Sequence, residues 1–152
     1  MSSELVFMMG QYEARFPTDR LYAKNHMWAM RQPSHALRFG LSGYAVRLLQ
    51  DVYFLDLTIE PEMELKSKQE IGSIESKKAE SSLYSPIEGK VLSLNQDLVN
   101  DPTAINLDRY GDGWMFELVG SETGLLTASE YLEHLNYAWE IAQRTIKGQA
   151  NA

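Results

Sequence analysis

Short runs of strand-forming residues, divided by turn residues, dominate the chain between residues 37 and 118. The runs are rich in Val, Ile, Leu, Phe and Tyr, and clusters of Gly, Pro, Asn and Asp separate them. Strands this short, with turns this frequent, pair with their neighbours in antiparallel sheets. The sequence therefore predicts a mainly β fold. The expected strands are 27–30, 37–41, 52–58, 70–75, 82–84, 90–94 and 114–118.

Helical spacing interrupts the strand pattern at a few places. Residues 42–49 predict a short helix with Tyr44, Leu48 and Leu49 on one face. The segment 95–109 predicts a turn and a short helical stretch, because Asn and Asp before Pro102 start turns.

A longer helix is expected near the C-terminus. Thr127 and Glu130 have the spacing of a capping box, in which each side chain binds the other residue's amide. A helix from about Ala128 to Lys147 follows, and Gly148 is its expected end. The apolar stripe predicted to face the β core consists of Leu132, Leu135, Trp139, Ala142 and Ile146.

Length and composition limit the function classes. A chain of 152 residues forms one domain of ordinary size, expected to span 1–152 with its β core at about 20–120. The net charge of -7 disfavours nucleic acid and anionic membranes as partners. The longest apolar run near the N-terminus, Leu5 to Met9, is too short for a membrane span or signal peptide, so a cytoplasmic protein is expected. The sequence has no cysteine, so disulfides, cysteine nucleophiles and cysteine metal sites are excluded.

One lysine stands out by its surroundings. Lys77, Lys78 and Ala79 lie between two strand-like arms, which predicts a β-hairpin with an exposed lysine at its tip. A lysine that is to be acylated must protrude on a rigid support, because the attaching enzyme has to surround it. A solvated lysine is the ordinary alternative, and we keep that interpretation for Lys77.

The segment around this lysine resembles the lipoylation segment of glycine cleavage H proteins, which has the form Glu-Ser-x-Lys-Ala. The resemblance covers roughly residues 16 to 135. Its motifs are Glu75 to Ala79, Leu83 to Pro86, Gly89, and the separate positions Pro17, Tyr22, His26, Trp28, Gly40, Tyr44, Ala45, Asn106, Tyr110, Gly111, Gly113 and Trp114. Several motifs in the right order are more specific than a single lysine in a turn.

The resemblance implies a flattened β-barrel, the barrel-sandwich hybrid of lipoyl domains, with short flanking helices. It implies a lipoyl group in amide linkage to Lys78, with Glu75, Ser76 and Ala79 as the context that a lipoate-attaching enzyme recognises. It also implies a carrier without catalysis of its own. Biotinyl domains, which place methionine on both sides of the lysine, fit less well, as do the linker-tethered lipoyl domains of 2-oxoacid dehydrogenases.

The resemblance leaves the cargo open. In the best-known members the arm takes an aminomethyl group from glycine decarboxylase, passes its carbon to folate through aminomethyltransferase, and is reoxidised by dihydrolipoyl dehydrogenase. This sequence departs from them in its longer termini, in Gln50 of the segment 48–51, and at 58–62. These departures favour the lipoate-binding proteins that serve a heterodisulfide-reductase-like complex in sulfur oxidation. A scaffold that has lost its lipoyl group is a third alternative, which the retained Lys78 argues against.

Other candidate residues have ordinary interpretations. His26, His35 and His134 fall in different predicted elements without ligand spacing, so no metal site is expected, and His26 is predicted to pack near the barrel. Glu75 and Glu80 flank the lysine, but alternating charge at a hairpin is usually solvation. No phosphate loop, nucleophile elbow or dinucleotide motif occurs, so no catalytic residue is predicted.

Overall fold

A computed structural model of the chain describes the backbone of residues 3–150 and the side chains of residues 3–144. The strands are β1 (Glu4–Met9), β2 (Tyr12–Pro17), β3 (Leu21–Tyr22), β4 (Met27–Arg31), β5 (Leu37–Leu41), β6 (Val52–Leu57), β7 (Glu64–Leu65), β8 (Glu70–Ser76), β9 (Glu80–Tyr84), β10 (Gly89–Leu94) and β11 (Trp114–Gly120). The helices are α1 (Gly43–Leu49), α2 (Gln96–Asn100), α3 (Thr103–Leu107) and α4 (Ala128–Ala150).

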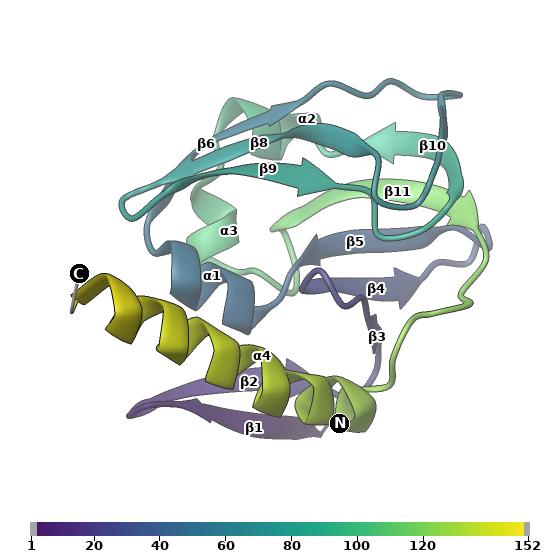
Figure 1. Ribbon diagram of the computed structural model, residues 1–152. Coiled ribbons are helices and arrows are strands. Elements are labelled where there is room, and N and C mark those ends of the chain that lie inside the picture. Colours follow the sequence, from purple (N-terminus) through teal and green to yellow (C-terminus); the bar gives the residue numbers. More distant parts are fainter. Residues whose placement is uncertain (1–2, 151–152) are drawn as a thin grey trace.

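The strands form a 6-stranded sheet of order β3-β4-β5-β11-β10-β7, a 3-stranded sheet of order β6-β8-β9, and the hairpin β1-β2. All strand pairs are antiparallel. The smaller sheet lies over the larger one, while α4 and the β1-β2 hairpin form the opposite side of the molecule (Figure 1). The predicted mainly β, barrel-sandwich fold is confirmed, although the described sheets do not join into a closed barrel.

The main hydrophobic core fills the space between the two larger sheets. Its fully buried members include Phe39, Ile71, Ile74, Phe116 and Leu118, which come from β5, β8 and β11. The polar residues between them, such as Arg38, Ser73 and Glu75, are only partly exposed, and Glu117 is buried, so both faces of these strands are largely covered. Burying a side chain of this size contributes about 1.5–3 kcal/mol before the entropy cost. This core holds the smaller sheet, and the hairpin it ends in, in place.

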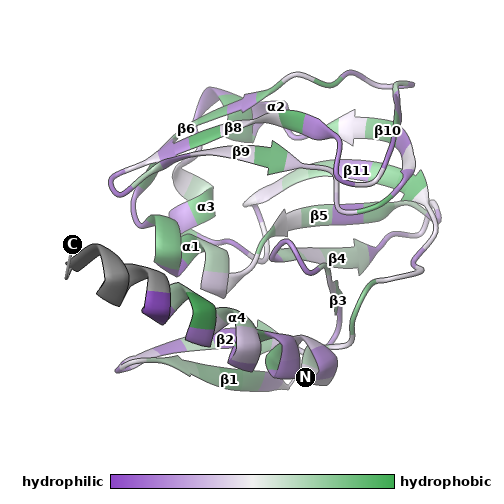
Figure 2. Cartoon of the chain, in the orientation of Figure 1, coloured by the Kyte–Doolittle hydropathy of each residue, from purple (hydrophilic) through white to green (hydrophobic). Residues whose placement is uncertain are grey.

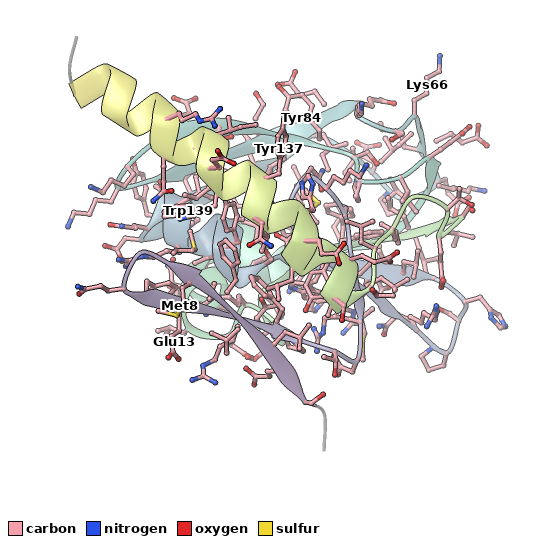
Figure 3. The ribbon with its side chains drawn as sticks, turned by 60° about the horizontal axis from the view of Figure 1, so that its bottom comes forward. Met8, Glu13, Lys66, Tyr84, Tyr137 and Trp139 are labelled. Carbon is pink, nitrogen blue, oxygen red and sulfur yellow. The ribbon has the colours of Figure 1, made fainter. Side chains whose placement is uncertain are left out.

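A second core lies under α4, and its composition corrects one expectation. The helix packs against the β1-β2 hairpin and the aromatic side of β3, β4 and α1, not against the main core. Tyr131 is its most buried residue together with Leu135, whereas the predicted members Leu132 and Trp139 are partly buried. Figure 3 shows α4 running alongside the hairpin that carries Met8 and Glu13.

The β1-β2 hairpin was not predicted, nor were the short strands β3 and β7. Gly10, with φ at 65°, forms the turn of this hairpin together with Gln11. A left-handed glycine between an apolar run and an alternating run is a hairpin signal, and it was available in the sequence. Phe7, Met9, Ala14 and Phe16 are buried and supply one wall of the second core.

Several helix predictions need smaller corrections. In α1, Ser42 caps the first turn and Tyr44 and Val46 are buried, but Leu48 is 41% exposed and does not share their buried face. The predicted helical stretch consists of α2 and α3. The helix α4 begins at the predicted capping box and continues past Gly148 to Ala150. The side chain of Ile146, predicted to be in the apolar stripe, lies outside the described residues.

None of the helices described between residues 3 and 150 combines the length and hydropathy needed to cross a bilayer.

Candidate functional site

The candidate site is the tip of the β8-β9 hairpin, where residues 77–79 connect the two strands. The tip protrudes beyond the sheets at the left of Figure 1, and it is coloured mainly as hydrophilic in Figure 2. Lys77, Lys78 and Ala79 are all exposed. Among the described residues neither lysine pairs with a carboxylate, although Glu75 and Glu80 face each other across the strands below the turn. The structure therefore confirms the predicted position of Lys78, exposed at the tip of a β-hairpin.

Ser76 fixes the conformation of the tip. Its backbone N–H donates to the carbonyl of Ala79 at 2.8 Å, and its hydroxyl donates to the same carbonyl at 3.1 Å. The same hydroxyl accepts the amides of Lys78 at 3.3 Å and Ala79 at 3.1 Å. Because Ser76 is buried, these bonds are shielded from water. The turn is therefore a rigid support for Lys78, and Ser76 is the residue that holds it.

The tip is also tied to the loop between α1 and β6. The backbone N–H of Lys77 donates to the carbonyls of Gln50 and Asp51, at 3.2 and 3.3 Å. Both loop residues have positive φ, 52° and 45°. This contact holds the end of the hairpin over α1, so Lys77 contributes its backbone while its side chain stays in solvent.

An apolar groove of about 190 Å³ runs beside the hairpin. Leu48 and Leu49 of α1 form one wall, and Leu83 and Tyr84 of β9 form the other. His26 also lines the groove, and Leu48, which is 41% exposed, is one of its lining residues. No local pattern indicates this groove, because its walls come from segments far apart in the chain.

His26 belongs to a buried polar network beneath the groove. Its Nδ1 lies 2.8 Å from the Tyr131 hydroxyl, which also lies 2.9 Å from the hydroxyl of Ser42. Burial, and to a smaller extent the neighbouring His134, lowers the pKa of His26 to about 4. Burial also raises the pKa of Tyr131 well above its usual value. His26 is therefore neutral near pH 7, and its predicted packing role is confirmed.

Two of the three histidines lie close together, although they are far apart in the sequence. The rings of His26 and His134 lie 5.9 Å apart, so α4 brings together two residues that the sequence placed in separate elements. His35 lies elsewhere, in the turn between β4 and β5, with φ at 66°. Within the described part of the chain, no group of three or more His, Cys, Asp or Glu residues could hold a metal ion.

The remaining motif residues make contacts in and around the second core. The Trp28 indole donates to the carbonyl of Arg109 at 2.8 Å, and a Cβ at residue 40 would lie 2.6 Å from that ring, so glycine is required there. The Tyr110 hydroxyl donates to the carbonyl of Arg15 at 2.6 Å and accepts the amide of Gly43 at 2.8 Å. Burial raises the pKa of Tyr110.

Trp114, the first residue of the last strand, is only partly buried. Its ring lies against the Arg38 guanidinium, 4.2 Å from the ring centre. Its role is a cation–π contact at the edge of the second core.

Comparison with known proteins agrees with this geometry. A model of the family described as "Glycine cleavage H-protein" matches residues 20–140. The chain belongs to the glycine cleavage H-protein family. The glycine cleavage system H protein of Mycolicibacterium gilvum is 33% identical over 130 residues, covering 85% of this chain and 98% of the relative. That of Stenotrophomonas maltophilia is 38% identical over 128 residues, covering 80% and 95%.

The family also has solved structures with this fold. A crystal structure of a glycine cleavage system H protein from Mycobacterium marinum superposes with a TM-score of 0.67 at 32% identity. The match covers 81% of this chain and 98% of that one. The family model begins at residue 20, so the β1-β2 hairpin lies outside the segment that it matches. Membership of the H-protein family therefore accounts for the two larger sheets and the lysine hairpin.

Proposed function

We propose that Lys78 bears a lipoyl group in amide linkage and that this chain is a lipoyl carrier protein. The observation that supports the proposal is the exposed Lys78 on a turn that Ser76 holds with hydrogen bonds on both sides. Members of the H-protein family carry lipoate on a lysine, and Lys78 has the matching position in the Glu-Ser-x-Lys-Ala segment. Lys77, one residue earlier, has its backbone fixed against the α1-β6 loop.

The tip fits the demands of attachment. A lipoate-attaching enzyme must reach Nζ of Lys78 without unfolding its support, and the exposed turn above two paired strands allows this. Amide formation removes the positive charge of Nζ. We propose that Glu75 and Ala79 contribute recognition, whereas Ser76 acts by fixing the turn.

The carrier role divides the chemistry between this chain and its partners. A lipoyl group, when bound, supplies a dithiolane whose S–S bond accepts a nucleophile or two electrons. The chain itself provides an attachment point on a rigid scaffold, which raises the effective concentration of a tethered group at a docked partner to the order of millimolar. We infer that catalysis belongs to the partner enzymes.

Of the two carrier systems, we favour glycine cleavage, with glycine decarboxylase, aminomethyltransferase and dihydrolipoyl dehydrogenase as partners. Each relative named above is a glycine cleavage H protein. Sulfur oxidation with a heterodisulfide-reductase-like complex, which the sequence departures favoured, has no support among these relatives. It is kept as a second candidate because the Gln50–Asp51 loop, where this sequence departs from glycine cleavage proteins, binds the backbone N–H of Lys77 at the tip.

The experiment supplies the lipoylated chain to each system. With glycine decarboxylase, we expect exchange of labelled bicarbonate into glycine that depends on the lipoylated chain and is lost in Lys78→Arg, which keeps the charge but blocks attachment. Lys77→Arg serves as the matched control and keeps the exchange. A lipoylated chain that is inert with glycine decarboxylase, but is turned over by a heterodisulfide-reductase-like complex, would reverse our preference.

A further inference from the structure

We propose that Arg47, Arg109 and Gln50 form a binding site for a small oxyanion, meaning a carboxylate or a sulfate-like or phosphate-like ion. They line a pocket of about 270 Å³ between α1, β2 and the end of α3, with Tyr12 and Asn106 on its other sides. The site is separate from the groove beside β9. The proposal concerns the unmodified chain and does not rest on lipoylation of Lys78.

The arginines of this pocket differ from the others in the chain. Carboxylates pair with Arg15, Arg20, Arg31, Arg38 and Arg144. The remaining arginines, Arg47 and Arg109, have no carboxylate partner among the described residues, and both line this pocket. A chain with 21 acidic and 14 basic residues has enough carboxylates to pair every arginine. Two guanidinium groups without an ion-pair partner in one concave site favour an anion from outside the chain.

Arg109 has an unfilled hydrogen-bonding capacity. One of its terminal nitrogens donates to the carbonyl of Asn106 at 3.1 Å, which holds the side chain in place. Its Nε is buried and has no hydrogen-bond partner among the described residues. A shielded nitrogen of a charged group without an acceptor is costly, and such groups often mark the place of an ion. Arg109 therefore lines the pocket with one shielded N–H that has no acceptor among the described residues.

Tyr12 positions the Arg47 side chain and leaves the N–H groups of its guanidinium available for hydrogen bonds. Its guanidinium lies over the ring of Tyr12, 4.3 Å from the ring centre. Stacking occupies the face of the guanidinium and leaves its N–H groups in the plane free to donate, which suits a pair of oxyanion oxygens. Tyr12 belongs to β2, outside residues 20–140 matched by the family model. The β1-β2 hairpin thus contributes one side of this site.

Gln50 keeps a side chain where the backbone favours glycine. Its φ and ψ are 52° and 133°, a region that side chains disfavour, and its N–H caps α1 by donating to the carbonyl of Val46 at 2.8 Å. Its side-chain amide lines the pocket and makes no hydrogen bond to the described residues. An amide donor beside two guanidinium groups is a third contact for an oxyanion.

The pocket also adjoins the hairpin tip and contains one opposing charge. The carbonyls of Gln50 and Asp51 accept the backbone N–H of Lys77, so a bound anion would lie below the lysine turn. The Asp51 carboxylate lines the same pocket and opposes anion binding. Asp51 has φ at 45°, which asparagine tolerates, so Asp51→Asn removes the opposing charge with little strain.

The test is a titration of the isotope-labelled full chain with sodium sulfate, sodium phosphate or sodium acetate, followed by NMR at constant ionic strength against sodium chloride. We expect saturable shifts of the Gln50 and Asp51 amides and of the Arg47 side-chain N–H with at least one oxyanion. Arg47→Gln and Arg109→Gln should each weaken binding about tenfold. Asp51→Asn should tighten it several-fold, and Arg31→Gln, an exposed arginine paired with Glu122, should leave it unchanged.

The proposal is overturned by shifts that grow linearly without saturation, or by saturable binding that both pocket variants retain. Arg109→Gln alters a side chain that holds Asn106, so its spectrum must match the wild type away from the pocket. If that variant fails to fold, Arg47→Gln decides, because the contact of its side chain with Tyr12 is on the surface of the hairpin. The oxyanion that binds most tightly identifies the ligand class.

Discussion

The side-chain amide of Asn106 forms two hydrogen bonds with the backbone of Val52. Its Oδ1 accepts the Val52 N–H at 2.9 Å, and its Nδ2 donates to the Val52 carbonyl at 2.8 Å. Val52 begins β6 and lies opposite Ser76, the residue that fixes the lysine turn. An asparagine distant in sequence thus anchors the strand on which the hairpin tip rests.

We expect Asn106→Ala to lower the free energy of unfolding by about 1–3 kcal/mol, because both partners on Val52 lose their bonds in a part-buried position. Urea unfolding followed by fluorescence measures the change. Asn100→Ala, whose side chain makes only an exposed contact with Gln96, is the control and should stay within about 0.5 kcal/mol of the wild type. Equal stability of both variants would contradict the anchoring role.

Ser76→Ala should loosen the tip without unfolding the sheet. The variant loses the hydroxyl that accepts the Lys78 and Ala79 amides, and each such bond contributes about 1 kcal/mol. Amide hydrogen exchange at residues 78 and 79 should therefore become several-fold faster. Ser81→Ala, an exposed serine on β9, should leave the exchange rates at the tip unchanged. Unaltered exchange in Ser76→Ala would show that backbone bonds alone hold the turn.

Stability should fall in acid because of His26. Its pKa is lowered to about 4 in the folded chain, against about 6.5 when unfolded, so the unfolded state binds a proton that the folded state does not. Above about pH 6.5, His26 is neutral in both states and does not change the free energy of unfolding. As the pH falls from about 6.5 to 4, the free energy of unfolding should decrease by up to about 3 kcal/mol.

His26→Asn isolates this effect. Asparagine tolerates the positive φ of 72° and does not titrate in this range. Unfolding free energies of the two proteins, measured by urea at several pH values, should show a flatter profile for the variant between pH 6.5 and 4. Parallel profiles would mean that His26 titrates normally in the folded chain.

Gln50→Gly should stabilise the chain and weaken the oxyanion site. Relief of the positive φ is expected to raise the free energy of unfolding by about 1 kcal/mol, which thermal unfolding detects. Gln50→Ala is the matched control, since it removes the same amide but keeps a Cβ and the strain. If both variants were more stable than the wild type, the destabilisation would come from the glutamine side chain and not from the backbone conformation.

The strands and the lysine tip could be predicted because their signals are local. The range 37–41 coincides with β5, and the predicted ranges for β4, β6, β8, β10 and β11 end within two residues of the observed bounds. The capping box of Thr127 and Glu130 forms as predicted, since its residues lie in one turn. Alternation and capping depend on near neighbours, so no tertiary information is needed.

The rest depends on contacts between distant segments. The Tyr131 hydroxyl meets His26 and Ser42 only after α4 folds onto β4 and α1, and so the predicted stripe omitted its most buried residue. The apolar run of β1 shows no alternation to mark it as a strand, although Gly10 after it indicated a hairpin turn. The pocket of Arg47 and Arg109 likewise joins α1, β2 and the segment after α3.

Lipoylation of Lys78 is tested most directly by intact-protein mass spectrometry after co-expression with a lipoate ligase and added lipoate. We predict a mass increase of one lipoyl group for the wild type and for Lys77→Ala, and none for Lys78→Ala. The unlipoylated variant should still fold, because the Lys78 side chain is exposed. A lipoyl group that persists in Lys78→Ala, or a wild-type chain that no lipoate ligase modifies, would contradict the carrier account.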